Sequence, residues 1–145
     1  MFDMKSDLQL VRMGGATLSG TTPANTSLID MQGFSALTVA LTTGTVTDAG
    51  TASGFTLKLQ HSDTTVGTDF VDCSAAEVIG DNLTVTSDAA DDSAIGTIGY
   101  RGNKRYVRAV ITGTTGTNAV VVVLGIKERA ATRAVTSIAA PVSAT

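Results

Sequence analysis

The chain has 145 residues and a formal net charge of −3; hydrophobic residues make up 43% and charged residues 16%. This length suits one small domain, and the composition is too apolar and too weakly charged for a disordered chain. A single cysteine, Cys73, excludes an intramolecular disulfide framework and a multi-cysteine zinc site. A single histidine, His61, excludes a two-histidine mechanism within one subunit.

The first residues of the chain do not have the pattern of a signal peptide. They contain Asp3 and Asp7 and no apolar run of the required length, so we expect no secretion by that route. The longest apolar stretch, residues 119–125, is far shorter than the roughly 20 residues that cross a bilayer. We therefore expect a protein that is made in a cytoplasm and has no membrane partner.

The first third of the chain predicts short strands between turn-rich segments. Residues 1–24 end in SGTTPANTS and predict an N-terminal arm, or a short edge strand over residues 8–13. A brief strand is expected over residues 27–31. Apolar and polar residues alternate over residues 34–42, which predicts a strand with one buried face. The small polar residues 43–54 predict an exposed loop.

The middle of the chain continues this pattern. Residues 55–61 alternate again and predict a strand, with His61 on the inward-facing side at its end. Residues 70–78 can supply one or two short strands around Cys73. The acidic residues 80–93 predict a long surface loop that can hold a short strand over residues 83–86.

The last third contains three strand patterns. Residues 95–100 and 104–112 predict two strands joined by a tight hairpin turn at Arg101-Gly102-Asn103. The Val-rich run at residues 119–127 predicts a continuous strand buried on both faces, at its clearest over residues 119–126. Residues 129–145 are poor in large apolar side chains and predict a C-terminal arm.

These elements predict an all-β protein, a β-sandwich or jelly-roll-like barrel with extended N- and C-terminal arms. The expected organisation is an N-terminal arm or edge strand (residues 1–24), a single β-domain (residues 25–128) and a C-terminal arm (residues 129–145). The predicted core consists of inward-facing residues of the four clearest strands: Leu37, Val39, Leu41, Phe55, Leu57, Leu59, Val107, Ile111, Val121 and Val123.

Charged residues of opposite sign are separated along the chain. Residues 63–92 contain eight acids and no Lys or Arg, whereas residues 101–133 contain seven Lys or Arg and one acid. These blocks can pair within the fold, pair across subunits, or form solvated surfaces; exposed pairs steer and orient more than they stabilise. The acidic block opposes direct nucleic-acid binding, and the basic block has only Tyr100 and Tyr106 for stacking.

No arrangement of residues predicts catalysis, so we expect a non-enzyme without cofactor, metal or catalytic residues. Cys73 and His61 lie on separate predicted segments, which favours structural roles over a nucleophile and its base. The spacing of Asp88, Asp91 and Asp92 matches no calcium loop, and whether these acids bind a cation stays open.

Three sequence stretches resemble small virion proteins encoded beside capsid genes in tailed bacteriophages. These are GFTLKLQHSDTTVG at residues 54–67, the following Asp69-Phe70, and IGYRGNKRYVRAVITGTTGTNAVVVVLG at residues 98–125. The resemblance covers about half of the chain. Its most specific part is YRGNKRYVR, residues 100–108.

The resemblance implies a capsid decoration (cement) protein, a small β-domain that binds the outer surface of the shell. The implied partners are the major capsid protein and further copies of the chain, commonly in a trimer, and the implied location is the capsid surface of a virion made in the host cytoplasm. Alternatives are a tail-tube or head-completion protein and, from another class, an extracellular binding module. We expect cationic side chains to make the protein contacts: Arg101, Lys104, Arg105, Arg108, Arg129 and Arg133.

Overall fold

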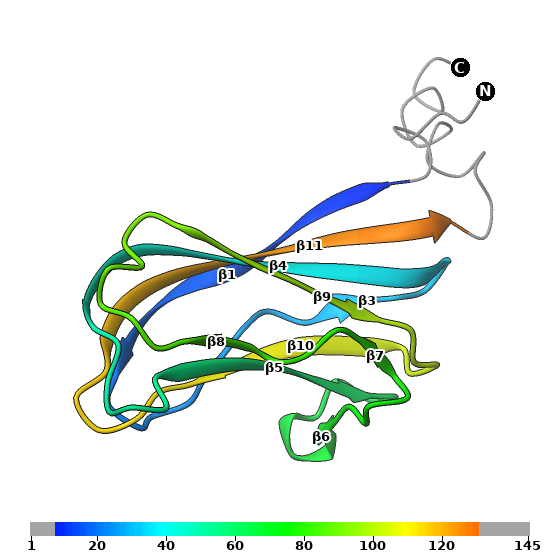
Figure 1. Cartoon of the computed structure of the whole chain (residues 1–145). Helices are drawn as coiled ribbons and strands as arrows, with labels where there is room; N and C mark the ends of the chain where they lie inside the picture. The colour runs from blue at the N-terminus through cyan, green and yellow to red at the C-terminus, as the bar shows by residue number, and fades with distance from the viewer. Residues whose placement is uncertain (1–7, 131–145) are drawn as a thin grey trace, which may run out of the picture.

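The computed structural model describes residues 8–130, which form two β-sheets packed face to face (Figure 1). One 3₁₀ turn, η1 (Gly67–Asp69), interrupts the strands. Among the residues described, no helix has the length and apolar character to cross a membrane. The strands in chain order are β1 (Gln9–Ser19), β2 (Ala24–Asn25), β3 (Ile29–Asp30), β4 (Phe34–Asp48), β5 (Phe55–Ser62), β6 (Val71–Asp72), β7 (Val78–Ile79), β8 (Leu83–Val85), β9 (Ala94–Tyr100), β10 (Tyr106–Thr112) and β11 (Asn118–Ala130).

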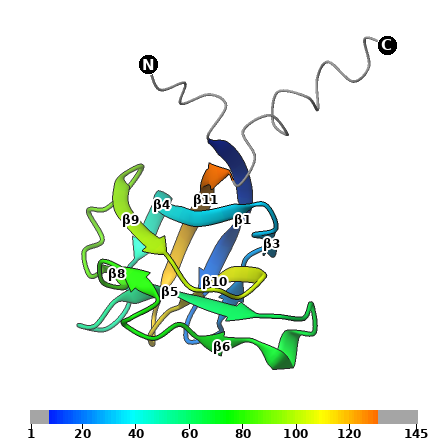
Figure 2. The same ribbon diagram turned by 90° about the vertical axis from the view of Figure 1, so that its right-hand side faces the viewer.

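The two sheets are antiparallel and differ in regularity. The first sheet has the order β1-β11-β4-β9-β7, so β1 is one of its edges. In the second sheet β10 pairs with β5; β2 and β3 pair with the other side of β10, and β6 and β8 with the other side of β5. Figure 2 shows the sheets as two layers. The predicted all-β sandwich is confirmed.

The core lies between the sheets and contains all ten residues predicted from the period-two patterns, each at most 2% exposed. Alternation identified them correctly because successive side chains of a strand point to opposite faces. Five further large side chains complete the core at 2% exposure or less: Met13, Leu18, Ile29, Ile98 and Tyr100.

The prediction that the Val-rich strand is buried on both faces is wrong. β11 has β1 and β4 on its two sides, but the second sheet covers only one of its faces. Val121 is fully buried, whereas Val120 is 40% exposed and Val122 is half-buried. A two-layer antiparallel sandwich leaves one face of each sheet to solvent, and the outward valines fit a pleated surface without needing full burial.

Two strands are longer than the sequence predicted. β1 continues to Ser19 instead of ending at Met13, because a β-bulge between Arg12 and Gly14 shifts the register and breaks the alternation. Gly14 adopts φ +122°, a conformation that favours glycine. β4 continues to Asp48, within the segment predicted as a loop, because Thr43 and Val46 turn inward and are buried. Residues 9–19 therefore form an edge strand of the sandwich.

The hairpin predicted at Arg101-Gly102-Asn103 is also wrong. β9 belongs to the first sheet and β10 to the second, so this connection crosses from one sheet to the other. Gly and Asn permit a tight change of direction, but they do not determine whether the next strand pairs with the previous one. The short strands predicted within residues 70–78 and 83–86 appear as β6, β7 and β8.

The C-terminal arm predicted for residues 129–145 begins within β11, which extends to Ala130. Arg133 and the rest of residues 131–145 lie outside the described residues, as do residues 1–7.

Candidate protein interface

The crossover between β9 and β10 is built around the side chain of Tyr100. The Tyr100 ring is buried between the sheets, and its hydroxyl accepts a hydrogen bond from the backbone N–H of Lys104 at 3.0 Å. Gly102 packs directly on this side chain: a Cβ at Gly102 would lie 2.5 Å from the hydroxyl oxygen. The YRGNK sequence therefore forms a tight loop around its own tyrosine.

His61 completes this polar cluster from the second sheet. Its Nδ1 lies 3.0 Å from the Tyr100 hydroxyl, and the two rings meet edge to face. The other ring nitrogen of His61, Nε2, lies 3.7 Å from a carboxylate oxygen of Glu77. Burial raises the pKa of Tyr100 to about 12, so the hydroxyl stays protonated at neutral pH.

Lys104 and Arg105 extend from this loop to form ion pairs at the surface. Lys104 Nζ donates to Asp63 at 2.5 Å. Arg105 donates two hydrogen bonds to the carboxylate of Asp30, at 2.9 and 3.1 Å, and a third to Gln32. The Arg105 guanidinium holds the pKa of the Asp30 carboxyl below its usual value.

The other interface candidates lie elsewhere. Arg108 points over the second sheet, where it donates to Gln60 at 2.8 and 2.9 Å and to the carbonyl of Gly67, and lies 4.4 Å from the Phe70 ring centre. Arg101 donates to the carbonyl of Ala76 at 2.9 Å. Arg129 is exposed near the end of β11.

An open groove of about 530 Å³ at one end of the sandwich brings two of the candidates together. Lys104 and Arg105 form one side, and the β3–β4 connection with the start of β4 forms the other, with Met31 and Phe34 as its apolar part. Lys127 lies 4.5 Å from the centre of the Phe34 ring. The groove thus combines exposed ion pairs with an apolar part on the side opposite Lys104 and Arg105.

Sequence reasoning missed Asp30, Phe34 and Lys127 as members of this site. Asp30 lies outside the acidic block, so block charges pointed to the wrong partner for Arg105. Lys127 is partly buried beside Phe34, and burial lowers its pKa. Neither residue has a local motif; only the pairing of β3 with β10 brings Asp30 beside the cationic loop.

The acidic loop serves as a source of hydrogen-bond acceptors for the backbone of β4. The Asp88 carboxylate accepts from the N–H of Ala49 at 2.7 Å, and Asp91 accepts from the N–H of Val46. Within residues 8–130, no group of three or more His, Cys, Asp or Glu side chains is placed to hold a metal ion. Two of the acids considered as cation ligands therefore fasten this loop to the sandwich.

Cys73 is half-buried and packs against the core. Burial, followed by the charges of Glu77 and Asp72, raises the pKa of its thiol to about 12. The thiol therefore stays protonated at neutral pH, which is the unreactive form.

Comparisons with known proteins give no assignment from sequence: no protein-family model matches the chain, and no curated protein matches it. Among solved structures, the chain is similar to a protein of the disulfide-linked pili that form Bacillus endospore appendages (12% identity, 86% of this chain and 89% of that chain, TM-score 0.44). It is similar to the SPBc2 prophage-derived protein YomS (16% identity, 83% and 92%, TM-score 0.39). It is also similar to a chain of the cyanophage Pam1 capsid asymmetric unit (15% identity, 83% and 84%, TM-score 0.43). Similarity at this level assigns no function.

Proposed function

We propose that the protein is a structural component of a tailed-bacteriophage virion, a decoration (cement) protein that binds the outer surface of the capsid. The observation that carries this proposal is the position of the YRGNKRYVR segment. The segment is the most specific part of the resemblance to phage virion proteins, and it also forms the crossover loop that presents Lys104 and Arg105 at the end groove.

The groove suits an acidic segment of the major capsid protein. The ion pairs at its rim are exposed, and such pairs contribute only about 0–1 kcal/mol each, so a partner carboxylate can replace Asp63 or Asp30 at little cost. Phe34 is half-buried and, with the largely buried Met31, forms the apolar part of one side of the groove, where it supplies contact area. On this proposal charge steers the encounter and apolar burial retains the partner.

On the same proposal the protein is not an enzyme and acts by binding alone, with the major capsid protein and other copies of itself as partners. His61 and Cys73 then have structural roles. His61 is held by Tyr100 across the core, and the Cys73 thiol is kept protonated by burial.

The test is co-sedimentation of the purified protein with undecorated phage heads over a series of salt concentrations. We expect binding by the wild type, weaker binding above about 0.15 M salt, where the Debye length falls below about 8 Å, and reduced binding by Lys104→Glu and Arg105→Glu.

Lys58→Glu is the matched control. Lys58 forms an equally exposed ion pair with Asp72, on the second sheet and away from the groove. Equal binding by Lys104→Glu, Lys58→Glu and the wild type at every salt concentration would contradict the interface. Assembly of the protein into hexameric rings and tubes would favour a tail-tube role instead, and a monomer that binds glycans would favour an extracellular binding module.

A further inference from the structure

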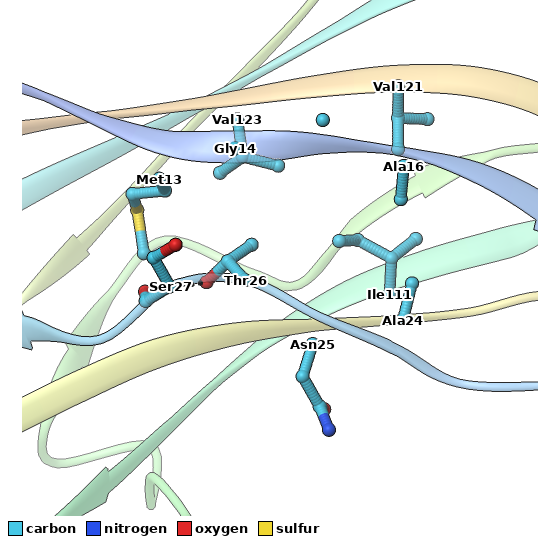
Figure 3. Close-up of a pocket in the computed structure, with 11 residues that line it drawn as sticks. Met13, Gly14, Ala16, Ala24, Asn25, Thr26, Ser27, Ile111, Val121 and Val123 are labelled. Atoms are coloured by element: carbon cyan, nitrogen blue, oxygen red, sulfur yellow. Dashed lines mark hydrogen bonds between the residues drawn. The ribbon is translucent and has the colours of Figure 1, made fainter.

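An uncharged cavity of about 110 Å³ lies where the two sheets part on one side of the sandwich (Figure 3). Its walls are β1 of the first sheet and residues 24–27 of the second, and we call it the β1–β2 seam. Ala16, Ile111 and Val121 point into it, whereas Asn25 points away. Aliphatic cavities of about 150 Å³ hold a benzene ring, so the seam has room for one branched aliphatic side chain.

The strand that borders the seam has an open edge. β1 is an edge strand of eleven residues with one charged residue, Arg12, and no proline. Long edge strands without Lys or Pro are templates for pairing with a further strand. In residues 8–130, the backbone hydrogen bond from Ser27 to the carbonyl of Met13 is the one that ties the outer side of β1 to the second sheet. Beyond Met13, β1 is open to an added strand.

We propose that the β1–β2 seam is filled by residues 134–140 of a second copy of this chain, added as a strand beside β1 with Ile138 in the cavity. The sequence AVTSIAA is uncharged, like every residue that lines the seam. In an extended strand, Thr136, Ile138 and Ala140 share one face, and Val135, Ser137 and Ala139 share the other. Strand addition takes affinity from backbone hydrogen bonds and specificity from alternate side chains.

The reach of the chain favours a second copy over the same copy. Gly14 pairs with Val123, so the seam lies seven residues back from Ala130, about 23 Å along β11 at about 3.3 Å per residue. A chain leaving Ala130 must reverse direction and pass around β1 before it can run back. Ile138 is eight residues beyond Ala130, about 26 Å fully extended, and the reversal consumes part of that length. Its own Ile138 therefore falls short of the seam.

Such a contact joins two different surfaces of the chain and so closes a ring when the rotation between copies permits. That such a ring has three copies is inferred from the proposed function. The contact at the seam is inferred independently of that function.

The first test measures self-association of the full chain by sedimentation velocity over a concentration series. We expect a wild-type oligomer and at least about a tenfold weaker association for Ile138→Ser, because the variant removes the aliphatic side chain that anchors the strand in the cavity. Val135→Ser, on the opposite face of the added strand, is the matched control and should change association by less than about threefold. A monomeric wild type, or equal effects of the two variants, would overturn the proposal.

The second test fills the seam from inside. Ala16→Leu places an aliphatic side chain in the existing cavity, so the folded monomer should unfold at the same or a higher temperature while association weakens. Thr17→Leu makes a similar enlargement on the outward face of β1 and should leave association intact. Unchanged association of Ala16→Leu would count against the seam.

The third test distinguishes the two sources of the strand. In a Cys73→Ala background, a Ser27→Cys protein is mixed with a Thr136→Cys protein and treated with a short bismaleimide. We expect crosslinked pairs of chains. Their yield should be well above the yield from a control mixture in which the Ser27→Cys protein is replaced by a protein with a cysteine at an exposed position, Thr86→Cys. If crosslinks form only within one chain that carries both cysteines, and not between two chains, the assignment of the strand to a second copy is wrong. An oligomer that passes these tests but does not bind heads would refute the proposed function and leave this inference intact.

Discussion

The hydroxyl of Tyr100 lies 3.0 Å from Nδ1 of His61 and thereby joins the two sheets through the core. Tyr100 belongs to β9 of the first sheet and His61 to β5 of the second, and the same hydroxyl fixes the backbone of Lys104. One oxygen thus ties together both layers and the loop that presents the candidate interface.

Removal of that oxygen should destabilise the fold. Tyr100→Phe leaves the Lys104 N–H and the buried His61 Nδ1 without their partner, and we expect the free energy of unfolding to fall by about 1–3 kcal/mol. Tyr106→Phe is the control, since its hydroxyl has no hydrogen bond among the described residues, and should cost less than about 0.5 kcal/mol. Urea unfolding followed by circular dichroism measures both. Equal costs would show that the Tyr100 hydroxyl is not a stabilising bridge.

Core truncation should separate buried from exposed leucines. Leu57 is fully buried in β5, and Leu57→Ala should lower the free energy of unfolding by about 2–4 kcal/mol. Leu10 is 68% exposed, and the chemically identical change Leu10→Ala should cost less than about 0.5 kcal/mol. The same urea experiment compares them, and a similar loss for both would contradict the inward orientation of β5.

The acidic loop should matter for stability through its acceptors. Asp88→Ala removes the carboxylate that accepts from the N–H of buried Ala49, and we expect a loss of about 1–3 kcal/mol. Asp81→Ala removes an exposed carboxylate with no side-chain hydrogen bond in the described part of the chain and serves as the control. Thermal unfolding at neutral pH is sufficient. If Asp81→Ala is as damaging as Asp88→Ala, the effect comes from net charge.

Alkaline pH should unfold the protein partly through Cys73. Its thiol has a pKa raised from 9.0 to about 12 in the fold, so above pH 9 the unfolded chain loses this proton while the folded chain keeps it. The folded state then binds more protons, and the free energy of unfolding falls as pH rises from about 9 to about 12. Cys73→Ser removes this contribution, so its stability should fall less steeply over that range.

The measurement for Cys73 is the urea midpoint at several pH values under reducing conditions. Tyr100 adds a loss of the same sign above pH 10, and Lys127, whose pKa is lowered by burial, adds a gain as pH rises. Both groups are present in wild type and variant, so the difference between the two curves reports Cys73 together with the part of the Tyr100 pKa that the Cys73 charge raises. Parallel curves from pH 9 to pH 12 would refute the raised pKa.

Sequence patterns predicted the faces of strands better than their partners. Alternation placed Leu57 and Leu59 in the core because the side-chain period of a strand is two, whatever the strand pairs with. The same pattern carries no information on which sheet receives the next strand, which is why the hairpin predicted at Arg101-Gly102-Asn103 is wrong. The bulge at Gly14 shifted the alternation of β1 and hid its second half.

The candidate site was only partly predictable for a related reason. The sequence predicts Lys104 and Arg105 as interface residues because they are cationic side chains beside a turn, and both line the groove. Asp30 ends the short strand β3 and Phe34 begins β4, 70 or more residues earlier in the chain, and only tertiary pairing brings them there. Arg108 stood out equally in sequence but is engaged with Gln60 and Phe70 on a different surface.

Because β1 pairs antiparallel with β11, the resistance of the domain to an applied force depends on the direction of that force. Gln9 lies opposite Lys127 at one end of this pair, and Ser19 lies opposite Asn118 at the other. Hydrogen bonds between antiparallel strands run perpendicular to the strands. A force that pulls Gln9 away from Lys127 therefore breaks these bonds one pair after another, starting at the Gln9 end. A force that drags Gln9 and Asn118 in opposite directions along the strands loads all of the bonds together, so the domain resists shear along β1 far better than peeling at the Gln9 end.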